Sequence, residues 1–132
     1  MAIEVQVVID CADPARLAAF WAKALDYRLE EPPAGVPGSD SNPASTLVDP
    51  AGTGPRFSFQ RVPEPKQVKN RLHVDLNVAG GRRLPAEERE APLQAEVERL
   101  TALGACLVEP VEVRGEYWIV MRDPEGNEFC IH

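Results

Sequence analysis

The pattern of hydrophobic positions divides the chain into short strands and two helices. Residues 5–11 (VQVVIDC) and 72–78 (LHVDLNV) place apolar side chains at alternate positions, with polar side chains between them. This period of two is typical of a strand that buries one face. We therefore predict a strand at each segment, and a stretch with helical spacing follows each one.

The two stretches with helical spacing carry helix end signals. Asp13 is a good N-cap residue and Pro14 suits the first helical position, while Gly104 fits the C-cap of the second helix. Apolar residues recur on one face of each predicted helix. They are Leu17, Phe20, Trp21 and Leu25 in the first helix, and Leu93, Val97, Leu100 and Leu103 in the second.

Three segments of the first half match three segments of the second half in the same order. The pairs are 5–11 with 72–78, 24–32 with 102–110, and 49–59 with 123–131. Three matches in order indicate an internal duplication. After each helix the pattern predicts two strands, at 27–31 and 45–49 in the first half and at 106–113 and 117–122 in the second, and then a closing strand with Phe.

Each half therefore reads β-α-β-β-β, and the sequence predicts an α+β protein of two tandem βαβββ modules. The modules cover about 1–61 and 71–132, within one domain, and residues 62–70 form the linker. We expect curved mixed sheets that enclose a cleft, with the helices on the outer face. Residues 32–44 are predicted to form a flap, and residues 80–92 a charged insertion before the second helix.

The strands that open and close the two halves each have a polar face. Side chains of a strand alternate between faces, so the apolar residues are assigned to the helix side and the others to the opposite side. The predicted helix side comprises Val5, Val7, Ile9, Phe57, Phe59, Leu72, Val74, Leu76, Phe129 and Ile131. The opposite side comprises Glu4, Gln6, Val8, Asp10, Arg56, Ser58, Gln60, Arg71, His73, Asp75, Asn77, Glu128, Cys130 and His132. Each residue alone is compatible with solvated surface, but the whole set favours a ligand-binding cleft.

Charge and cysteine content exclude several classes of partner. The formal net charge is -7, from 14 Lys and Arg against 21 Asp and Glu, so phosphate backbones and anionic lipid are repelled. We predict no nucleic-acid or membrane partner. Three sparse cysteines without CxxC spacing suit a reducing compartment, and we expect free thiols and a cytoplasmic protein without a leader segment.

The chain resembles the vicinal oxygen chelate superfamily, in particular its glyoxalase-like, bleomycin-resistance and ring-cleaving dioxygenase members. The segments that carry this resemblance are DPARLAAFWAKAL, RLHVDL, VERLTALGA and WIVMRDPEGNEFCI. In metal-dependent members, one side chain from each opening and closing strand binds a divalent ion. The resemblance places these ligands at Gln6, Ser58, His73 and Cys130, and the internal repeat pairs the same positions.

This set lacks the two carboxylates that the family pattern has, and hard divalent ions prefer anionic oxygens. We therefore predict no resident metal or other cofactor. If a divalent metal binds, its expected ligands are Gln6, His73 and Cys130, and zinc accepts the thiolate and imidazole. Glu128 and His132 lie on the same predicted face as Cys130 and are alternative ligands.

Several polar-face residues have a second interpretation. His73 is the best candidate for a general acid or base, beside Asp75, although a hydrogen-bonding His is the simpler role. Cys130 is either a reactive thiolate near Arg56 or His132 or a small wall residue. The remaining predicted ligand-binding residues are Gln6, Arg56, Ser58, Arg71, Trp118 and Glu128.

Two functions are compatible with these residues. The first is a small-molecule-binding protein without the usual metal site, which sequesters or senses a partly aromatic or anionic ligand. The alternative is a metal-dependent lyase, isomerase or dioxygenase. No nucleotide-binding, zincin or serine-hydrolase motif is present. The resemblance also implies a homodimer.

Overall fold

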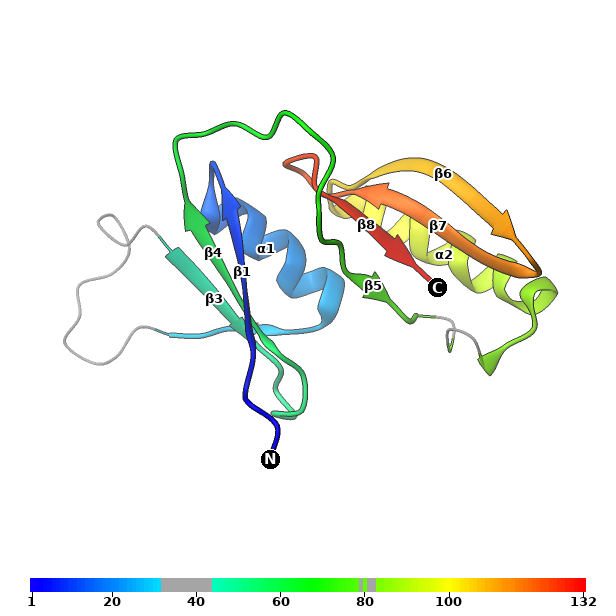
Figure 1. The fold of residues 1–132 in the computed structure, drawn as a ribbon, viewed down its shortest axis with the longest axis horizontal. Helices are drawn as coiled ribbons and strands as arrows, with labels where there is room; N and C mark the ends of the chain where they lie inside the picture. Colours follow the sequence, from blue (N-terminus) through cyan, green and yellow to red (C-terminus); the bar gives the residue numbers. More distant parts are fainter. Residues whose placement is uncertain (32–43, 79, 81–82) are drawn as a thin grey trace. The chain divides into compact units, whose positions relative to one another are not determined.

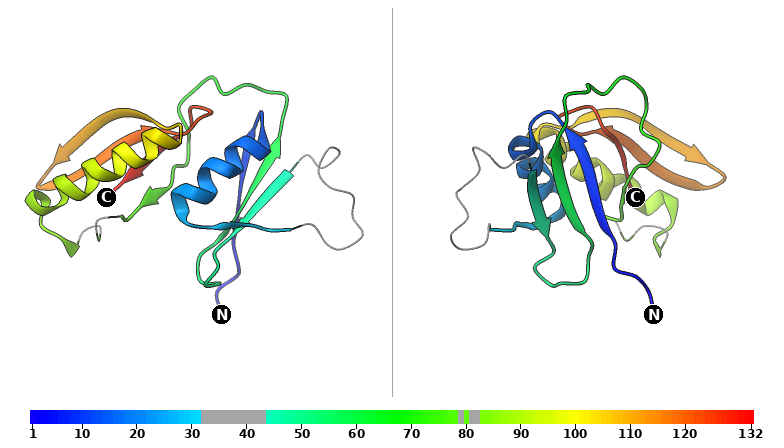
Figure 2. Two further views of the ribbon diagram at one scale, coloured as in Figure 1. Left: turned by 180° about the vertical axis from the view of Figure 1, so that it is seen from behind. Right: turned by 60° about the vertical axis from the view of Figure 1, so that its left-hand side comes forward.

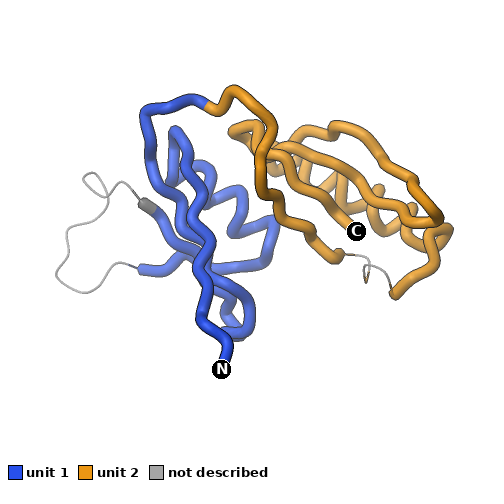
Figure 3. The backbone as a smooth tube through the Cα atoms, in the orientation of Figure 1, with its two compact units in different colours: residues 1–65 blue, residues 66–132 orange. Residues whose placement is uncertain are grey.

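The computed structural model describes residues 1–31, 44–78, 80 and 83–132, which fall into two compact units at residues 1–65 and 66–132 (Figures 1 and 3). Most of the flap predicted at residues 32–44 lies outside the described residues. In the described part of the chain, no helix is both long and apolar enough to cross a bilayer.

The first unit contains one helix and a four-stranded sheet. Its elements are β1 (Gln6–Cys11), α1 (Pro14–Leu25), β2 (Arg28–Leu29), β3 (Ala44–Val48) and β4 (Arg56–Arg61). The strand order is β1-β4-β3-β2, in which β1 and β4 are parallel and the other pairs are antiparallel. Helix α1 packs against β2, β3 and β4.

The second unit repeats this topology. Its elements are β5 (Asp75–Leu76), α2 (Ala86–Leu103), β6 (Cys106–Val113), β7 (Glu116–Arg122) and β8 (Glu128–Ile131). The strand order is β5-β8-β7-β6, with β5 and β8 parallel, and α2 covers one face of the sheet, as Figure 2 shows. The two predicted βαβββ modules are therefore confirmed.

The helix faces pack where the hydrophobic pattern places them. Asp13 caps α1, because its carboxylate accepts the Arg16 backbone N–H at 3.2 Å. Gly104 ends α2 with a φ of 117°. The buried cores comprise Leu17, Phe20, Trp21, Leu47, Phe57 and Phe59 in the first unit, and Leu93, Val97, Leu100, Ile119, Met121, Phe129 and Ile131 in the second.

Both Asp-Pro-x-Gly segments form the predicted turns. Gly52 and Gly126 adopt positive φ values of 72° and 85°, which glycine tolerates best. The Asp49 carboxylate accepts the Ala51 N–H at 2.8 Å, and that of Asp123 accepts the Glu125 N–H at 2.9 Å. The duplication thus extends to the hydrogen bonds of these turns.

Two local predictions are wrong. Helix α2 begins at Ala86 and contains Pro92, so much of the charged segment 80–92 is helix. The first turn of the helix carries the acidic residues Glu87 and Glu88, and buried Arg89 donates from its Nε to the Leu84 carbonyl at 2.6 Å.

The second error concerns the ends of the opening strands. Leu72 and Val5 are 88% and 65% exposed, whereas both were assigned to the helix side. Strand β5 pairs with β8 only at Asp75 and Leu76, and β1 begins at Gln6, so neither residue lies in a sheet. Alternation of side chains between faces holds only where a strand is paired.

Candidate functional site

The face of the second sheet opposite α2 carries the candidate site. Ile119, Met121, Phe129 and Ile131 are buried on the helix side. Alternation therefore places Trp118, Val120, Cys130 and His132 on the other side. The strand register sets Cys130 between Asp75 of β5 and Val120 of β7. The strand positions of this sheet thus bring polar and apolar groups onto one face.

Three potential metal-binding side chains meet on this face. The ligand atoms of His73, Asp75 and Cys130 all lie within 4.8 Å of one another. The His73 Nε2 lies 3.3 Å from Asp75 Oδ1. On the other side of the carboxylate, His132 Nε2 lies 3.4 Å from Asp75 Oδ2. The Asp75 carboxylate is therefore flanked by two imidazoles, and we refer to His73, Asp75 and Cys130 as the second-unit cluster.

The members of the cluster differ in exposure. The side chains of His73 and Asp75 are 48% and 49% exposed, whereas Cys130 is buried. Burial raises the pKa of the Cys130 thiol, and the nearby Asp75 carboxylate raises it further, while the Lys69 ammonium acts in the opposite direction. The thiol therefore stays protonated at neutral pH. A protonated thiol is a poor nucleophile, so this environment does not favour a reactive Cys130.

An aromatic pair borders the second-unit cluster. The Trp118 ring stacks on the His132 imidazole with a centroid distance of 5.9 Å and an interplanar angle of 20°. The side chain of His132 is only 15% exposed. The stack and the contact with Asp75 together fix the orientation of His132.

A pocket of about 600 Å³ lies within the second unit. Val120 of β7 and Glu128 of β8, which share a face with Cys130, form part of its wall. The rest of the wall comes from the segment after Pro65, from β6 and from the turn before β8. The lining residues are Lys66, Gln67, Val68, Lys69, Val108, Glu109, Val120, Arg122, Glu125, Gly126 and Glu128.

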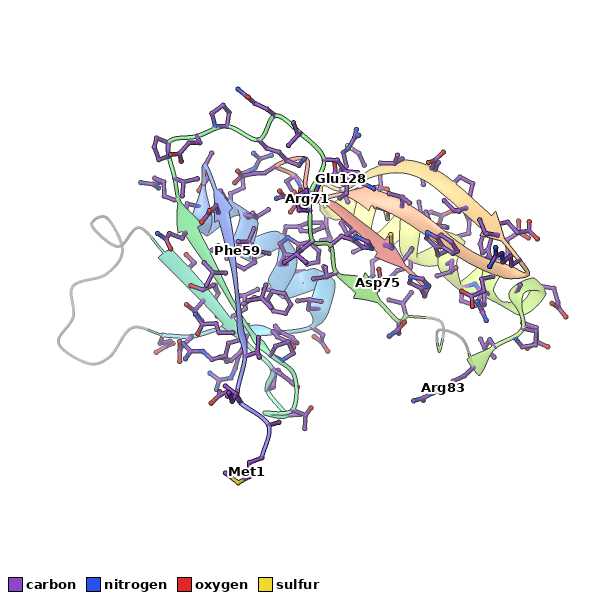
Figure 4. All side chains as sticks on the ribbon, viewed as in Figure 1. Met1, Phe59, Arg71, Asp75, Arg83 and Glu128 are labelled. Carbon is purple, nitrogen blue, oxygen red and sulfur yellow. The ribbon has the colours of Figure 1, made fainter. Side chains whose placement is uncertain are left out.

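Glu128 attaches the segment at 66–70 to the second sheet. Its carboxylate lies 3.2 Å from Lys66 Nζ, accepts the Asn70 backbone N–H at 3.1 Å and lies 3.8 Å from Arg122 Nε. Burial raises the pKa of Glu128, but the hydrogen bonds from Asn70 and Lys66 outweigh it, so the pKa is below its usual value. Glu128, labelled in Figure 4, is therefore an anchor for this segment as well as a pocket residue.

The predicted site residues of the first unit have other partners. Arg56 forms an ion pair with Glu30, and the Ser58 hydroxyl lies 3.2 Å from the Thr46 hydroxyl. Gln6 is exposed at the start of β1, where it pairs with Arg56 in the strand register. Arg71, also labelled in Figure 4, is exposed in the segment before β5.

Lys66 and Lys69 were not among the predicted site residues, and His132 was predicted only as an alternative metal ligand. His132 shares strand parity with Cys130, and that signal was available in the sequence. Lys66 and Lys69 were assigned to a linker, and no periodic pattern marks a segment that packs through its polar groups. His73, Asp75, Trp118, Glu128 and Cys130 all belong to the second unit, together with these three residues.

The four metal ligands implied by the family resemblance do not fit a divalent ion well. Ser58 offers a neutral hydroxyl that already has a hydrogen-bonding neighbour, and Gln6 offers a neutral amide. His73 is also neutral as a ligand, so Cys130 alone would bring negative charge. Divalent ions are held by several anionic donors or by sets of thiolate and imidazole, and this set supplies too few of either.

Comparison with known proteins is consistent with this fold. Three solved structures that the chain resembles come from Burkholderia phytofirmans PsJN, Mesorhizobium loti and Listeria monocytogenes. The first is a glyoxalase/bleomycin resistance protein/dioxygenase family enzyme with 20% identity and a TM-score of 0.64, covering 96% of this chain and 94% of that one. No curated protein matches the chain.

The other two are fosfomycin resistance proteins named FosX. The Mesorhizobium loti protein has 14% identity and a TM-score of 0.69, covering 100% of this chain and 91% of its own. A mutant of the Listeria monocytogenes protein, in complex with Mn(II) and 1S,2S-dihydroxypropylphosphonic acid, has 16% identity and a TM-score of 0.70, covering 100% and 92%. At these identities the likeness concerns the fold.

A family model extends the match to sequence. The model of the glyoxalase-like domain matches residues 6–132, which include both βαβββ units. The resemblance to the vicinal oxygen chelate superfamily predicted from the sequence is confirmed. This chain therefore belongs to the glyoxalase-like domain family.

Proposed function

We propose that this chain is a glyoxalase-like small-molecule-binding protein without the usual four-ligand metal site of its superfamily. The observation that carries the proposal is the pocket of about 600 Å³ in the second unit, which has both apolar and cationic lining residues. Its volume lies within the range of roughly 300–1,000 Å³ that is typical of ligand sites.

The lining of the pocket favours a ligand with an anionic group and an apolar part. Val108 and Val120 supply apolar surface, and Lys66, Lys69 and Arg122 supply cations. Glu128 lies near Lys66 and Arg122 and partly neutralises their positive charge. Lys69 influences the pKa of the Cys130 thiol, so its charge acts on both the pocket and the cluster. We assign Lys69 the main role in binding the anionic group.

Substitution of Lys69 tests this function. A panel of small aryl carboxylates and aryl phosphonates is titrated calorimetrically into protein treated with a chelator. We expect Lys69→Ala to weaken binding about ten- to hundredfold, because one charge-assisted hydrogen bond contributes about 1.5–3 kcal/mol. Lys23→Ala removes the same charge from α1 and should leave affinity unchanged.

Two results would contradict the proposal. Either no member of the panel binds, or a member binds with equal affinity to the wild type and to Lys69→Ala. Thermal unfolding of each variant confirms that a lost affinity does not come from a lost fold. Metal-free conditions keep this test separate from any metal site.

A metal-dependent lyase, isomerase or dioxygenase is the second candidate, and the second-unit cluster favours it. A bound divalent ion would supply a Lewis acid for vicinal oxygens of a substrate. In that case turnover should require added metal and disappear in His73→Ala. Turnover that is unchanged in His73→Ala would exclude this function.

Assembly and location complete the proposal. We expect a cytoplasmic homodimer with a small-molecule ligand and neither nucleic acid nor membrane as a partner. Cys11, Cys106 and Cys130 are free thiols, which supports a reducing compartment. The net charge of -7 supports the absence of polyanionic partners.

A further inference from the structure

We propose that the pocket of the second unit binds a ligand with two opposite charges, its anionic group at Lys69 and its cationic group at Glu109. The class of ligand is an aminocarboxylate in which an apolar part, such as an aromatic ring, separates the ammonium group from the carboxylate. This inference rests on the proposed function and deepens it, because the binding of a simple anion gives the Glu109 carboxylate no role.

The pocket is lined by basic and acidic side chains in equal number. The basic ones are Lys66, Lys69 and Arg122, and the acidic ones are Glu109, Glu125 and Glu128. Binding surfaces generally carry charges complementary to those of their partners. A simple anion would meet the acidic side chains as well as the basic ones. The balanced lining therefore favours a ligand that also has a positive group.

Several of these charges already have partners within the second unit. The Glu128 carboxylate lies 3.2 Å from Lys66 Nζ and 3.8 Å from Arg122 Nε. By contrast, neither Lys69 nor Glu109 has a side-chain hydrogen bond or an ion pair among the residues that the structure describes. Both side chains are exposed, so a ligand in the pocket can reach them.

A β-bulge turns Glu109 toward the pocket. The register of β6 and β7 shifts by one residue at Val108, after which Glu109 pairs with Val120. Without this extra residue Glu109 would pair with Ile119, which is buried on the helix side of the sheet. Directly paired residues have their side chains on the same face, so the bulge places the Glu109 carboxylate on the face opposite α2. Bulges often occur next to functional sites, where they change the direction of a side chain.

The two proposed contacts lie on opposite sides of the pocket. Glu109 belongs to β6, whereas Lys69 belongs to the segment at 66–70, which Glu128 of β8 holds through the Asn70 N–H at 3.1 Å. Strands β6 and β8 lie on either side of β7 (Figure 1). Neighbouring strands are about 4.8 Å apart, so β6 and β8 are roughly 10 Å apart. A ligand that reaches both side chains must therefore carry its two charges far apart.

Apolar side chains lie between the two charges. Val120 is in the central strand β7, where it pairs with Glu109 on one side and with Cys130 on the other. Val108, the extra residue of the bulge, also lines the pocket. An aromatic ring with a charged group at each end matches this order of negative, apolar and positive lining. An α-amino acid, in which both charges are attached to one carbon, cannot reach both ends.

Pairs of ligands that differ only in an amino group test the inference. 4-Methylbenzoate and 4-(aminomethyl)benzoate are titrated calorimetrically into chelator-treated protein at low ionic strength. We expect the amino ligand to bind about three- to fivefold more tightly, because an ion pair between exposed groups adds a modest free energy. The difference should shrink when salt is added, because salt screens exposed charges. Phenylglycine should show no such gain over phenylacetate.

Three substitutions identify the carboxylate that contacts the amino group. Glu109→Gln should remove the preference for 4-(aminomethyl)benzoate and leave the affinity for 4-methylbenzoate no weaker than in the wild type. Glu112→Gln is the matched control, because it removes the same charge from the same strand at a position that pairs with Tyr117 outside the pocket lining. Glu125→Gln removes a different carboxylate of the lining. Both of these variants should keep the preference, and thermal unfolding checks that each variant is folded.

The outcomes separate this inference from the proposed function. It is overturned if 4-(aminomethyl)benzoate binds no more tightly than 4-methylbenzoate, if the preference persists in Glu109→Gln, or if Glu112→Gln or Glu125→Gln removes it. In these cases binding of 4-methylbenzoate that depends on Lys69 still supports the proposed function. If neither ligand binds, both the inference and the proposed function fail.

Discussion

Charge and burial of single side chains set the chemistry of the second-unit face. Cys130 is buried next to the Asp75 carboxylate, and both features keep its thiol neutral. Cys106, by contrast, lies exposed at the start of β6, and Cys11 is buried at the end of β1. Thiols with such different surroundings should be chemically distinguishable.

We predict that a thiol reagent will modify one cysteine rapidly and two slowly at neutral pH. The fast thiol is Cys106, because only an accessible thiolate attacks the reagent. Time-resolved absorbance of released aromatic thiolate measures the two phases. Cys106→Ser should abolish the fast phase, and a fast phase that persists in this variant would contradict the assignment.

Ser58 and Glu128 each have contacts that the sequence pattern does not predict. The Ser58 hydroxyl has Thr46 as its neighbour, and the Glu128 carboxylate holds Lys66 and Asn70. Strand parity predicts the face of each residue but not its partner. The partners come from a neighbouring strand and from the segment after Pro65.

Among the structural elements, the two Asp-Pro-x-Gly turns have similar hydrogen bonds but differ in burial. Asp123 is only 2% exposed and accepts backbone N–H groups of Glu125 and Asn127 at 2.9 and 3.0 Å. Asp49 accepts similar bonds, from Ala51 and Gly54, but in an exposed turn. Water can replace the bonds of Asp49 more easily than those of Asp123.

Asp123→Ala should therefore lower the free energy of unfolding by about 2–3 kcal/mol, because buried donors lose their acceptor. Urea denaturation followed by circular dichroism measures the change. Asp49→Ala is the matched control and should be clearly less destabilising. Equal losses for both substitutions would show that burial of the turn is not the cause.

Helix α2 also shows how tertiary contacts modify a local prediction. Residues 80–92 were predicted as an insertion before the helix, yet the helix runs from Ala86 to Leu103 and includes Pro92. Buried Arg89 bonds to the Leu84 carbonyl, and Leu93 is fully buried in the core of the second unit. The burial of this turn outweighs the backbone hydrogen bond that proline cannot make.

Net charge and oligomeric state are properties of the whole molecule. An excess of acidic groups, with a net charge of -7, is expected to repel polyanions. The pocket and the second-unit cluster both lie within one unit of the chain.

We predict a dimer at micromolar concentration in sedimentation equilibrium. Lys69→Ala and His73→Ala should have the same mass as the wild type, because their roles are within the second unit. A monomer at all concentrations up to the micromolar range would exclude the homodimer. This result would not bear on the pocket or on the second-unit cluster.

Features that depend on neighbours along the chain follow from the amino-acid sequence alone. Helix faces such as Leu17 and Phe20, the caps at Asp13 and Gly104, and the duplicated βαβββ order all follow from local periodicity and local backbone preference. The family followed from the same segments.

Which polar groups come into contact depends on strand pairing and packing. His73 and Asp75 reach Cys130 because β5 pairs with β8 in one register, and a shift of that register would separate them. Glu128 became an anchor because the segment at 66–70 lies against it. Such contacts join residues far apart in the sequence, so their geometry depends on strand pairing and packing, which no local pattern encodes.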